Sequence, residues 1–183
     1  MTEEHGLGRL RPVEEGDLEA MLAWRNAPVV REKMYTRHEI SLEEHRAWWT
    51  ATRQREDRAY FVYECDDVPL GIVGFTDMDP VDRIAAWAFY ASPQAPRGTG
   101  GRMEYLALEY AFSFLGLEKL YCEVLDFNDA VVRMHEKFGF QREGLFREQH
   151  VYGNDRIGIV RMGLLRREWE ARRDAARARV GRR

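Results

Sequence analysis

The sequence has 183 residues, a length that predicts a single domain spanning residues 1–183, because one hydrophobic core accommodates a chain of this size. Hydrophobic residues make up 45% of the chain and charged residues 32%, and the formal net charge is −3, a balance that excludes the disordered and fibrous classes. The chain does not begin with a cationic stretch and an apolar run, and no window holds the roughly 18 apolar residues of a membrane helix, so we expect a cytoplasmic location and no membrane partner.

Hydrophobic periodicity predicts an antiparallel first half of the chain. A capping box, Ser41-Leu42-Glu43-Glu44, opens one of its helices, because Ser41 and Glu44 can satisfy each other's backbone amides. Asp66-Asp67-Val68-Pro69 predicts a hairpin turn. The predicted elements are a short strand over 7–12, helices over 17–24 and 41–55, and strands over 59–65, 70–78 and 84–90.

The second half alternates strands and helices, which predicts a β-α-β-α-β order and an α/β class with a mixed sheet. Asn128 stands where the N-cap of a helix is expected. The predicted elements are a helix over 103–114, a strand over 119–125, a helix over 128–138, strands over 140–151 and 156–164, and a basic C-terminal helix over about 166–183.

Residues 166–183 carry eight arginines. A basic end of this kind is more often a solvated helix end or a frayed tail than a nucleic-acid contact, so nucleic acid is not expected as a partner. Cys65 and Cys122 lie in apolar stretches and predict buried free thiols rather than a disulfide. The five histidines show no spacing typical of a metal site, so no metal is expected.

A glycine-rich segment, Arg97-Gly98-Thr99-Gly100-Gly101, lies between the strand over 84–90 and the helix over 103–114. Closely spaced glycines allow backbone N–H groups to converge, and a helix N-terminus adds partial positive charge, so the segment suits a pyrophosphate, with Arg97 as an added cation. A plain turn explains the same glycines equally well. The spacing matches neither a Walker A loop nor the dinucleotide fingerprint.

A second pattern begins at Asn128 and ends in His135-Glu136-Lys137-Phe138-Gly139-Phe140. Arg-Gly-x-Gly-Gly after a strand and, about thirty residues later, Asn with a ring side chain seven positions on and Glu-Lys-x-Gly-Phe resemble the two coenzyme A-binding motifs of the GCN5-related N-acetyltransferase (GNAT) superfamily. The resemblance covers roughly residues 9–169. It implies the acyl-CoA N-acyltransferase fold, a central mixed sheet of about seven strands flanked by helices.

The resemblance also implies acetyl-CoA as co-substrate and a way to hold it. The loop over 97–101 would bind the pyrophosphate, Ala88-Phe89-Tyr90 would pair with the pantetheine amides, Asn128 would contact the pantetheine arm, and Lys137 would be a further cofactor contact. One position departs from the family motif, because Arg102 stands where a small residue is usual. Arg102 would alter how closely the helix meets the pyrophosphate, or Gly101 would serve instead.

Within the superfamily, the chain most resembles the N-acetyltransferases of pseudaminic acid biosynthesis, which act on the 4-amino group of a UDP-linked dideoxy sugar. This resemblance implies a UDP-amino sugar as acceptor. The matching segments are Trp24-Arg25-Asn26, Met34, Ile40-Ser41-Leu42, Leu70-Gly71, Phe89-Tyr90, Glu123-Val124 and His135-Glu136-Lys137. The Trp-Arg-Asn segment also occurs in acetyltransferases of protein N-termini, which are the alternative.

Acetyl transfer to an amine requires a base, because an aliphatic amine with a pKa of about 8 to 10 is mostly protonated at neutral pH. Glu123 is the first candidate, since a charge within an apolar strand should be either functional or paired structurally. Asp77 and Asp79, which follow another strand, are rival bases, although turn capping explains them too.

His135 is the candidate acid, because it stands seven residues after Asn128, where the family commonly has a tyrosine. Seven residues are nearly two helical turns, so both side chains should face one cofactor. With a pKa of about 6.5, histidine would make the rate more pH-sensitive than tyrosine would. A satisfied helix histidine is the competing interpretation. Tyr90 is a second acid candidate, with a packed aromatic residue as its alternative.

Five side chains are expected to contact the acceptor: Trp24, Arg25, Asn26, Met34 and Asp77. Aromatic rings stack on a base or sugar, and an arginine suits a diphosphate. Trp48 and Trp49 are adjacent on a predicted helix, so at least one should be core. A non-catalytic acyl-CoA-binding module is a third function, and the presence of both Glu123 and His135 argues against it. Small transferases of this kind often form dimers, so a homodimer is a further expectation.

Overall fold

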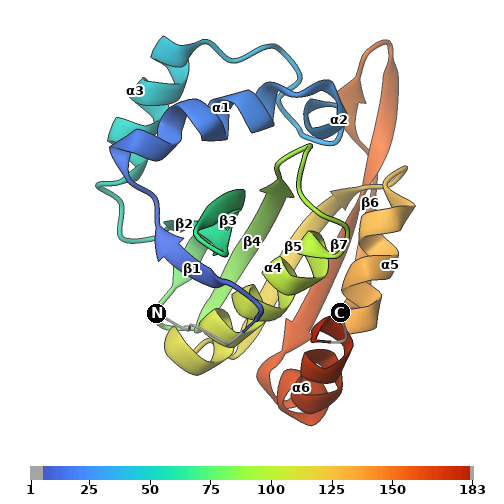
Figure 1. The fold of residues 1–183 in the computed structure, drawn as a ribbon. Coiled ribbons are helices and arrows are strands. Elements are labelled where there is room, and N and C mark those ends of the chain that lie inside the picture. Colours follow the sequence, from blue (N-terminus) through green and yellow to red (C-terminus); the bar gives the residue numbers. More distant parts are fainter. Residues whose placement is uncertain (1–5, 182–183) are drawn as a thin grey trace.

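The computed structural model describes residues 6–181 and contains a seven-stranded mixed sheet flanked by helices, as predicted (Figure 1). Among the described strands only β4 and β5 pair in parallel. The strand order is β1-β2-β3-β4-β5-β7-β6. The strands are β1 (Arg9–Pro12), β2 (Ala59–Cys65), β3 (Val68–Asp79), β4 (Ile84–Ala91), β5 (Lys119–Leu125), β6 (Gln141–Tyr152) and β7 (Asp155–Leu165).

The helices divide between the two faces of the sheet (Figure 1). Helices α4, α5 and α6 contribute to a large core cluster on one face, whereas α1 and α3 enclose a smaller cluster on the other. A short 3-10 helix, η1 (Glu15–Asp17), precedes α1, and a π-helical segment, η2 (Tyr110–Phe114), continues α4. The α-helices are α1 (Leu18–Asn26), α2 (Pro28–Arg31), α3 (Leu42–Thr52), α4 (Thr99–Glu109), α5 (Asp129–Phe138) and α6 (Arg166–Val180).

Alternation along the strands assigns side chains to these two faces. In β3, Val73 and Phe75 belong to the large cluster, whereas Ile72 belongs to the cluster under α1 and α3. The period of two therefore gives the central strands a core on both sides. The same alternation in β4 and β5 controls which side chains of the site face which helices.

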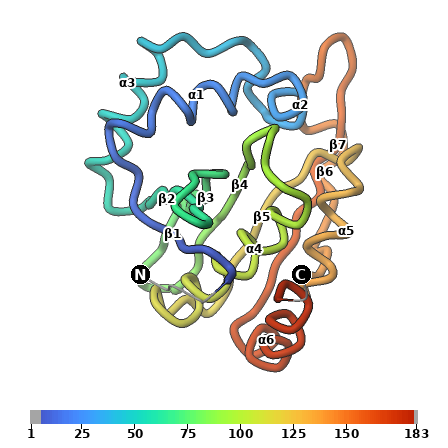
Figure 2. Tube along the Cα trace, viewed as in Figure 1, coloured from blue at the N-terminus to red at the C-terminus, as the bar shows by residue number. Residues whose placement is uncertain are grey.

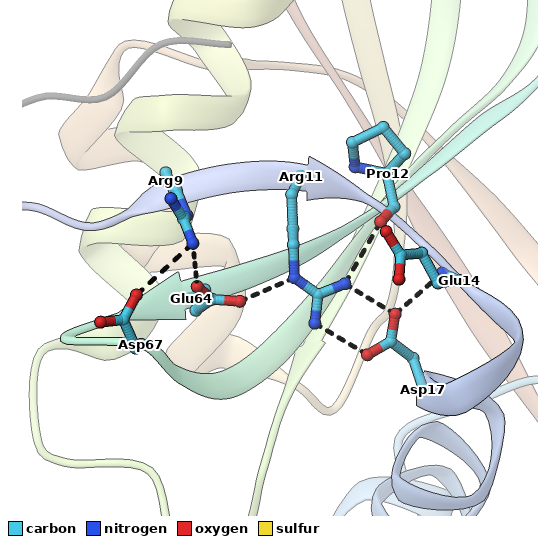
Figure 3. A network of polar contacts seen from close by, with 7 residues as sticks. All are labelled: Arg9, Arg11, Pro12, Glu14, Asp17, Glu64 and Asp67. Atoms are coloured by element: carbon cyan, nitrogen blue, oxygen red, sulfur yellow. Dashed lines mark hydrogen bonds and ion pairs between the residues drawn. The ribbon is translucent and has the colours of Figure 1, made fainter.

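A network of charged residues fixes the start of α1 against the sheet (Figure 3). Arg11 on β1 donates two hydrogen bonds to Asp17, at 2.7 and 2.8 Å, and one of 2.7 Å to Glu64 on β2. The Arg11 guanidinium lowers the pKa of Asp17 through these hydrogen bonds. The Arg11 guanidinium thus joins β1, β2 and the turn before α1. Because these three segments are bonded to one another, the network sets where α1 crosses the sheet.

Two local predictions differ from the structure, and a third is confirmed in position only. Helix α4 begins at Thr99 instead of residue 103, since Gly98 takes a left-handed conformation (φ 94°) as N-cap and the Thr99 hydroxyl donates to the Pro96 carbonyl at 2.7 Å. Ser41 caps α3 by accepting from the Glu44 amide at 3.1 Å, but the Glu44 carboxylate contacts His38 instead of completing the capping box. Asn128 occupies the N-cap position of α5 without a side-chain cap bond.

The basic C-terminal segment is a packed helix. Trp169 of α6 is 1% exposed and donates to the buried Glu109 of α4 at 3.1 Å, and Arg173 donates to the same carboxylate at 2.8 Å. Within residues 6–181, no helix combines the length and apolar character that crossing a bilayer requires. Cys65 and Cys122 are free thiols as predicted, although Cys65 is only half-buried because it ends β2 at the hairpin turn.

Candidate active site

The parallel strands β4 and β5 separate along their length. They pair only through residues 84–86 of β4 and 119–121 of β5. From Trp87 and Cys122 onwards the two strands are no longer paired with each other, although β4 still pairs with β3 and β5 with β7. The facing edge of β4 therefore presents backbone N–H and C=O groups to a cleft.

This cleft has two compartments. The first, of about 210 Å³, extends towards α5 and includes Asn128, Val131 and His135 in its wall. The second, of about 310 Å³, extends towards Tyr60, Asp77 and Arg161. The compartments share eight residues, so they meet in the gap between the strands: Met34, Tyr35, Trp87, Ala88, Phe89, Tyr90, Cys122 and Glu123.

His135 lies in the wall of the first compartment and is held by a buried carboxylate. Its Nδ1 is 2.8 Å from Glu104 Oε1, and the two residues are 2% and 0% exposed. Burial lowers the pKa of His135, but the charge of Glu104 and the Cys122 side chain outweigh it, and the pKa is raised to about 10. Burial also raises the pKa of Glu104, so the pair retains a proton at neutral pH.

This environment corrects the expectation of an ordinary histidine titrating near pH 6.5. With a pKa of about 10, His135 is comparable to a tyrosine side chain, the residue that the resemblance implies at this position. Asn128 and His135 do line one compartment, as their spacing predicted.

Glu123 lies on the opposite face of β5 and lines both compartments. Its carboxylate accepts one hydrogen bond from Arg161 at 3.0 Å and another from the Tyr35 hydroxyl at 2.9 Å. The Arg161 guanidinium also covers the Tyr121 ring at 3.4 Å from its centroid. Burial, and then the bond to Glu123, raise the pKa of Tyr35, which keeps this hydroxyl a donor. The carboxylate is thus paired structurally and also open to the cleft.

Tyr90 and Asp77 occupy different parts of the cleft wall. Tyr90 is half-buried, lines both compartments, and has its pKa raised by burial. Asp77 is exposed, has a positive φ of 50° and lines the second compartment. Asp79 instead caps a turn by accepting from the amides of Val81 and Asp82, at 2.8 and 2.9 Å.

The glycine-rich segment reaches the cleft through Gly100. A Cβ atom at Gly100 would lie 3.5 Å from Met134 of α5 and 3.7 Å from Phe89 of the cleft wall. Gly101 faces Phe138 and Val180, at 3.9 and 3.8 Å. The start of α4 therefore lies between the cleft and helices α5 and α6.

The charged residues near this loop lie outside the walls of the two compartments. Arg102 directs its guanidinium towards Cys65 Sγ, at 4.0 Å, so Gly101 is the small residue that faces the neighbouring helices. Arg97 is exposed beside the start of α4. Lys137 is exposed in the last turn of α5, outside the walls of both compartments, and its role in holding the cofactor remains a prediction.

The five expected acceptor contacts are distributed over the region. Met34 lines both compartments, as Asp77 lines the second. Asn26 uses its amide to bind the Ile40 backbone, at 2.8 and 2.9 Å, and Trp24 packs against the smaller core cluster. Arg25 donates to the Thr36 carbonyl at 3.0 Å and lines a third cavity. Of the adjacent tryptophans, Trp49 is core and Trp48 lines that same third cavity.

Three residues of the site were not anticipated from the sequence: Tyr35, Glu104 and Arg161. Glu104 had a detectable signal, since it is an acid within the apolar helical run 103–108. Tyr35 had none, because it follows α2 in irregular chain and meets Glu123 across 88 positions of sequence.

Residues 9–141 match the model of the acetyltransferase (GNAT) domain family. The chain belongs to the GNAT family. It is accordingly an N-acetyltransferase, and acetyl-CoA is the co-substrate typical of GNAT enzymes.

Two relatives bear on which subgroup of the family the chain resembles. Spermidine N(1)-acetyltransferase of Escherichia coli K12 is 30% identical over 165 residues, covering 89% of this chain and 88% of that protein. The acetyltransferase PseH of Campylobacter jejuni is 24% identical over 124 residues, covering 68% of this chain and 76% of that protein. The comparisons thus do not support the expected nearness to the nucleotide-sugar subgroup.

Among solved structures, spermidine N-acetyltransferase from Vibrio cholerae in complex with CoA and spermine superposes with a TM-score of 0.83. Its sequence identity is 24%, and the match covers 88% of this chain and 96% of that one. This likeness shows that the two chains share the GNAT fold.

Proposed function

We propose that this GNAT enzyme transfers the acetyl group of acetyl-CoA to a primary amine of a small molecule, with Glu123 as base and His135 as acid. One observation carries the proposal: the two side chains enter the same gap between β4 and β5 from opposite faces of the sheet. His135 belongs to the α5 side, and Glu123 faces the second compartment.

The residues present fit acetyl-CoA. The amides and the dipole at the start of α4 suit the diphosphate, with Arg97 nearby. The free edge of β4 over Ala88–Tyr90 suits the pantetheine amides, and Asn128 lies in the same wall. When bound, acetyl-CoA supplies a thioester carbonyl that an amine can attack.

The side chains then divide the proton transfers. Glu123 takes the proton from the amine, directly or through water, while Arg161 and Tyr35 hold its carboxylate in place. As the N–C bond forms, a backbone N–H from the unpaired part of β4 stabilises the oxyanion. When the C–S bond breaks, His135 gives its proton to the thiolate, since a pKa of about 10 keeps the ring protonated at neutral pH.

Two acceptor classes deserve comparison. A polyamine is favoured by the spermidine acetyltransferase relatives, and Asp77 and Glu123 offer carboxylates to a cation. The alternative acceptor is the 4-amino group of a UDP-linked dideoxy sugar. The positive charges of Arg161 and Lys33 offset the negative charges of those carboxylates, so the cleft wall has no net charge that would select a polycation.

The acceptor is identified by mixing the enzyme with acetyl-CoA and candidate amines while following the release of free thiol. We expect turnover with spermidine or with a UDP-4-amino sugar and none with peptides that mimic protein N-termini. Turnover with peptides alone would contradict the small-molecule proposal. If none of the candidate amines led to thiol release, the catalytic assignment of the cleft would be contradicted.

A further inference from the structure

A third cavity lies beside the cleft, on the face of the sheet covered by α1 and α3. It has a volume of about 310 Å³ and shares Tyr60, Ile72 and Tyr90 with the second compartment. We call it the aromatic side cavity, and its relevant lining residues are Arg25, His45, Trp48, Tyr60, Ile72 and Tyr90. The two spaces are therefore neighbours, and a molecule whose amine reacts at Glu123 would have to pass Tyr60 and Tyr90 to reach the aromatic side cavity.

Two buried polar atoms in this wall have no hydrogen-bond partner among the described residues: Arg25 Nη1 and His45 Nε2. The other end of the Arg25 guanidinium donates to the Thr36 carbonyl, and no carboxylate of the described residues forms an ion pair with Arg25. A buried polar atom without a partner costs free energy, so native proteins keep one mainly where a ligand or water completes it.

The two atoms offer opposite hydrogen-bonding roles. His45 Nε2 has no partner, and the interaction of the ring with the Leu18 backbone favours the tautomer that carries its proton on Nδ1. Burial, the largest effect, lowers the pKa of His45, and the nearby Arg25 charge lowers it further. The ring is therefore neutral at pH 7. His45 Nε2 is therefore an acceptor, whereas Arg25 Nη1 is a donor.

The aromatic part of the wall suits a flat ring, whereas Glu44, which also lines the cavity, contacts His38. Trp48 is stacked with His45, with ring centroids 5.3 Å apart and planes at 18°, and it meets Tyr60 edge to face at 5.1 Å. Aromatic walls of this kind bind planar ligands by stacking. A polyamine offers neither a ring nor an acceptor for Arg25.

We infer that the aromatic side cavity binds a planar heterocycle that presents a carbonyl beside an N–H, as a uracil ring does, in the part of the acceptor distant from its amine. The carbonyl would accept from Arg25 and the ring N–H would donate to His45 Nε2, while Trp48 and Tyr60 cover the ring. This inference rests on the proposed function and narrows it to a nucleotide-linked amine.

Calorimetry with uridine 5′-monophosphate as the probe tests the cavity independently of turnover. We expect saturable binding, weakened about tenfold when the ring N–H is blocked in the N3-methyl analogue and about tenfold by Arg25→Met, because each change leaves one buried polar atom without a partner. Arg46→Met is the matched control: Arg46 is an exposed arginine of α3 outside the cavity wall, and its loss should leave binding unchanged.

The outcomes separate the two proposals. Equal binding of uridine monophosphate and its N3-methyl analogue, no binding at all, or equal effects of Arg25→Met and Arg46→Met would overturn the inference. If the enzyme nevertheless acetylates spermidine, the proposed function stands without it. If the base binds as expected but no amine is acetylated, the cavity assignment stands and the proposed reaction fails.

Discussion

At the scale of single residues, the pairing of His135 with Glu104 gives a buried histidine the raised pKa that suits a proton donor. The contact of 2.8 Å lies in a fully buried setting, where a carboxylate acts strongly on the charge of its neighbour. The result is a proton donor that remains charged across the neutral range.

Replacing His135 should lower turnover with little change in coenzyme A affinity, because the ring is proposed to act on the leaving thiolate. We expect His135→Ala and His135→Gln to reduce kcat by about 10²- to 10⁴-fold in steady-state assays. The glutamine side chain can still form a hydrogen bond with Glu104. This variant therefore distinguishes the loss of the proton donor from the effect of leaving the buried Glu104 carboxylate without a partner. An unchanged kcat in both variants would remove His135 from the mechanism.

The pH dependence should follow the same pair. With a folded pKa of about 10, His135 is protonated below that pH, so the alkaline fall of kcat should lie near pH 10. In Glu104→Gln the charge of the carboxylate is lost while the burial of the ring remains, so the pKa of His135 falls and the alkaline fall of kcat should move to clearly lower pH. A kcat profile measured from pH 6 to 11 checks this. A profile that Glu104→Gln leaves in place would contradict the assignment.

The choice of base can be tested with two isosteric changes. Glu123→Gln should reduce kcat/KM by about 10²- to 10⁴-fold, since the amide cannot accept the amine proton. Asp77→Asn should have a much smaller effect, because Asp77 is exposed at the end of the second compartment whereas Glu123 lines both. The reverse order of effects, measured by thiol release, would make Asp77 the base.

At the scale of elements, α6 holds α4 in place, and α4 carries both Glu104 and the glycine-rich start. Trp169→Ala should destabilise the protein by about 3–5 kcal/mol, because it removes a buried aromatic side chain and the bond to Glu109. Thermal unfolding should show a Tm about 10 °C lower. Glu170→Ala, at the exposed neighbouring position, is the control, and equal Tm values for the two variants would contradict the role given to α6.

The strands were the elements most accessible to sequence reasoning. The period of two predicted residues 119–125 as a strand, and the structure has β5 over Lys119–Leu125. Helix α4 was predicted too short, because the pattern gives no weight to glycines, yet Thr99, Gly100 and Gly101 form its first turn. Helix α2 was missed, since four residues are too few to show a period.

The site was partly predictable for a similar reason. Asn128 and His135 line one compartment, which followed from their spacing of seven residues on a helix, and Glu123 could be recognised as a charge within an apolar strand. The partners of these residues did not follow. Tyr35 and Arg161 reach Glu123 from distant segments, and only the packing of α2 and β7 around β5 brings them there.

At the scale of the whole molecule, the chain closes the cleft with segments far apart in sequence. The tip of the β6–β7 hairpin lies beside α2 (Figure 2), where the Tyr152 hydroxyl donates to the Glu32 carbonyl at 3.1 Å and Arg37 covers the Tyr152 ring at 3.7 Å. These contacts hold Met34 and Tyr35 over the gap between β4 and β5. The homodimer expected from the sequence remains a prediction.

In the proposed mechanism, the diverging strands β4 and β5 and the start of α4 together bind acetyl-CoA. A crystal structure of the enzyme soaked with coenzyme A tests this most directly. We expect the diphosphate against the amides of residues 99–101 and the thiol between Trp87 and Cys122, within reach of His135. Coenzyme A bound elsewhere, or with its thiol outside the gap between β4 and β5, would contradict the account.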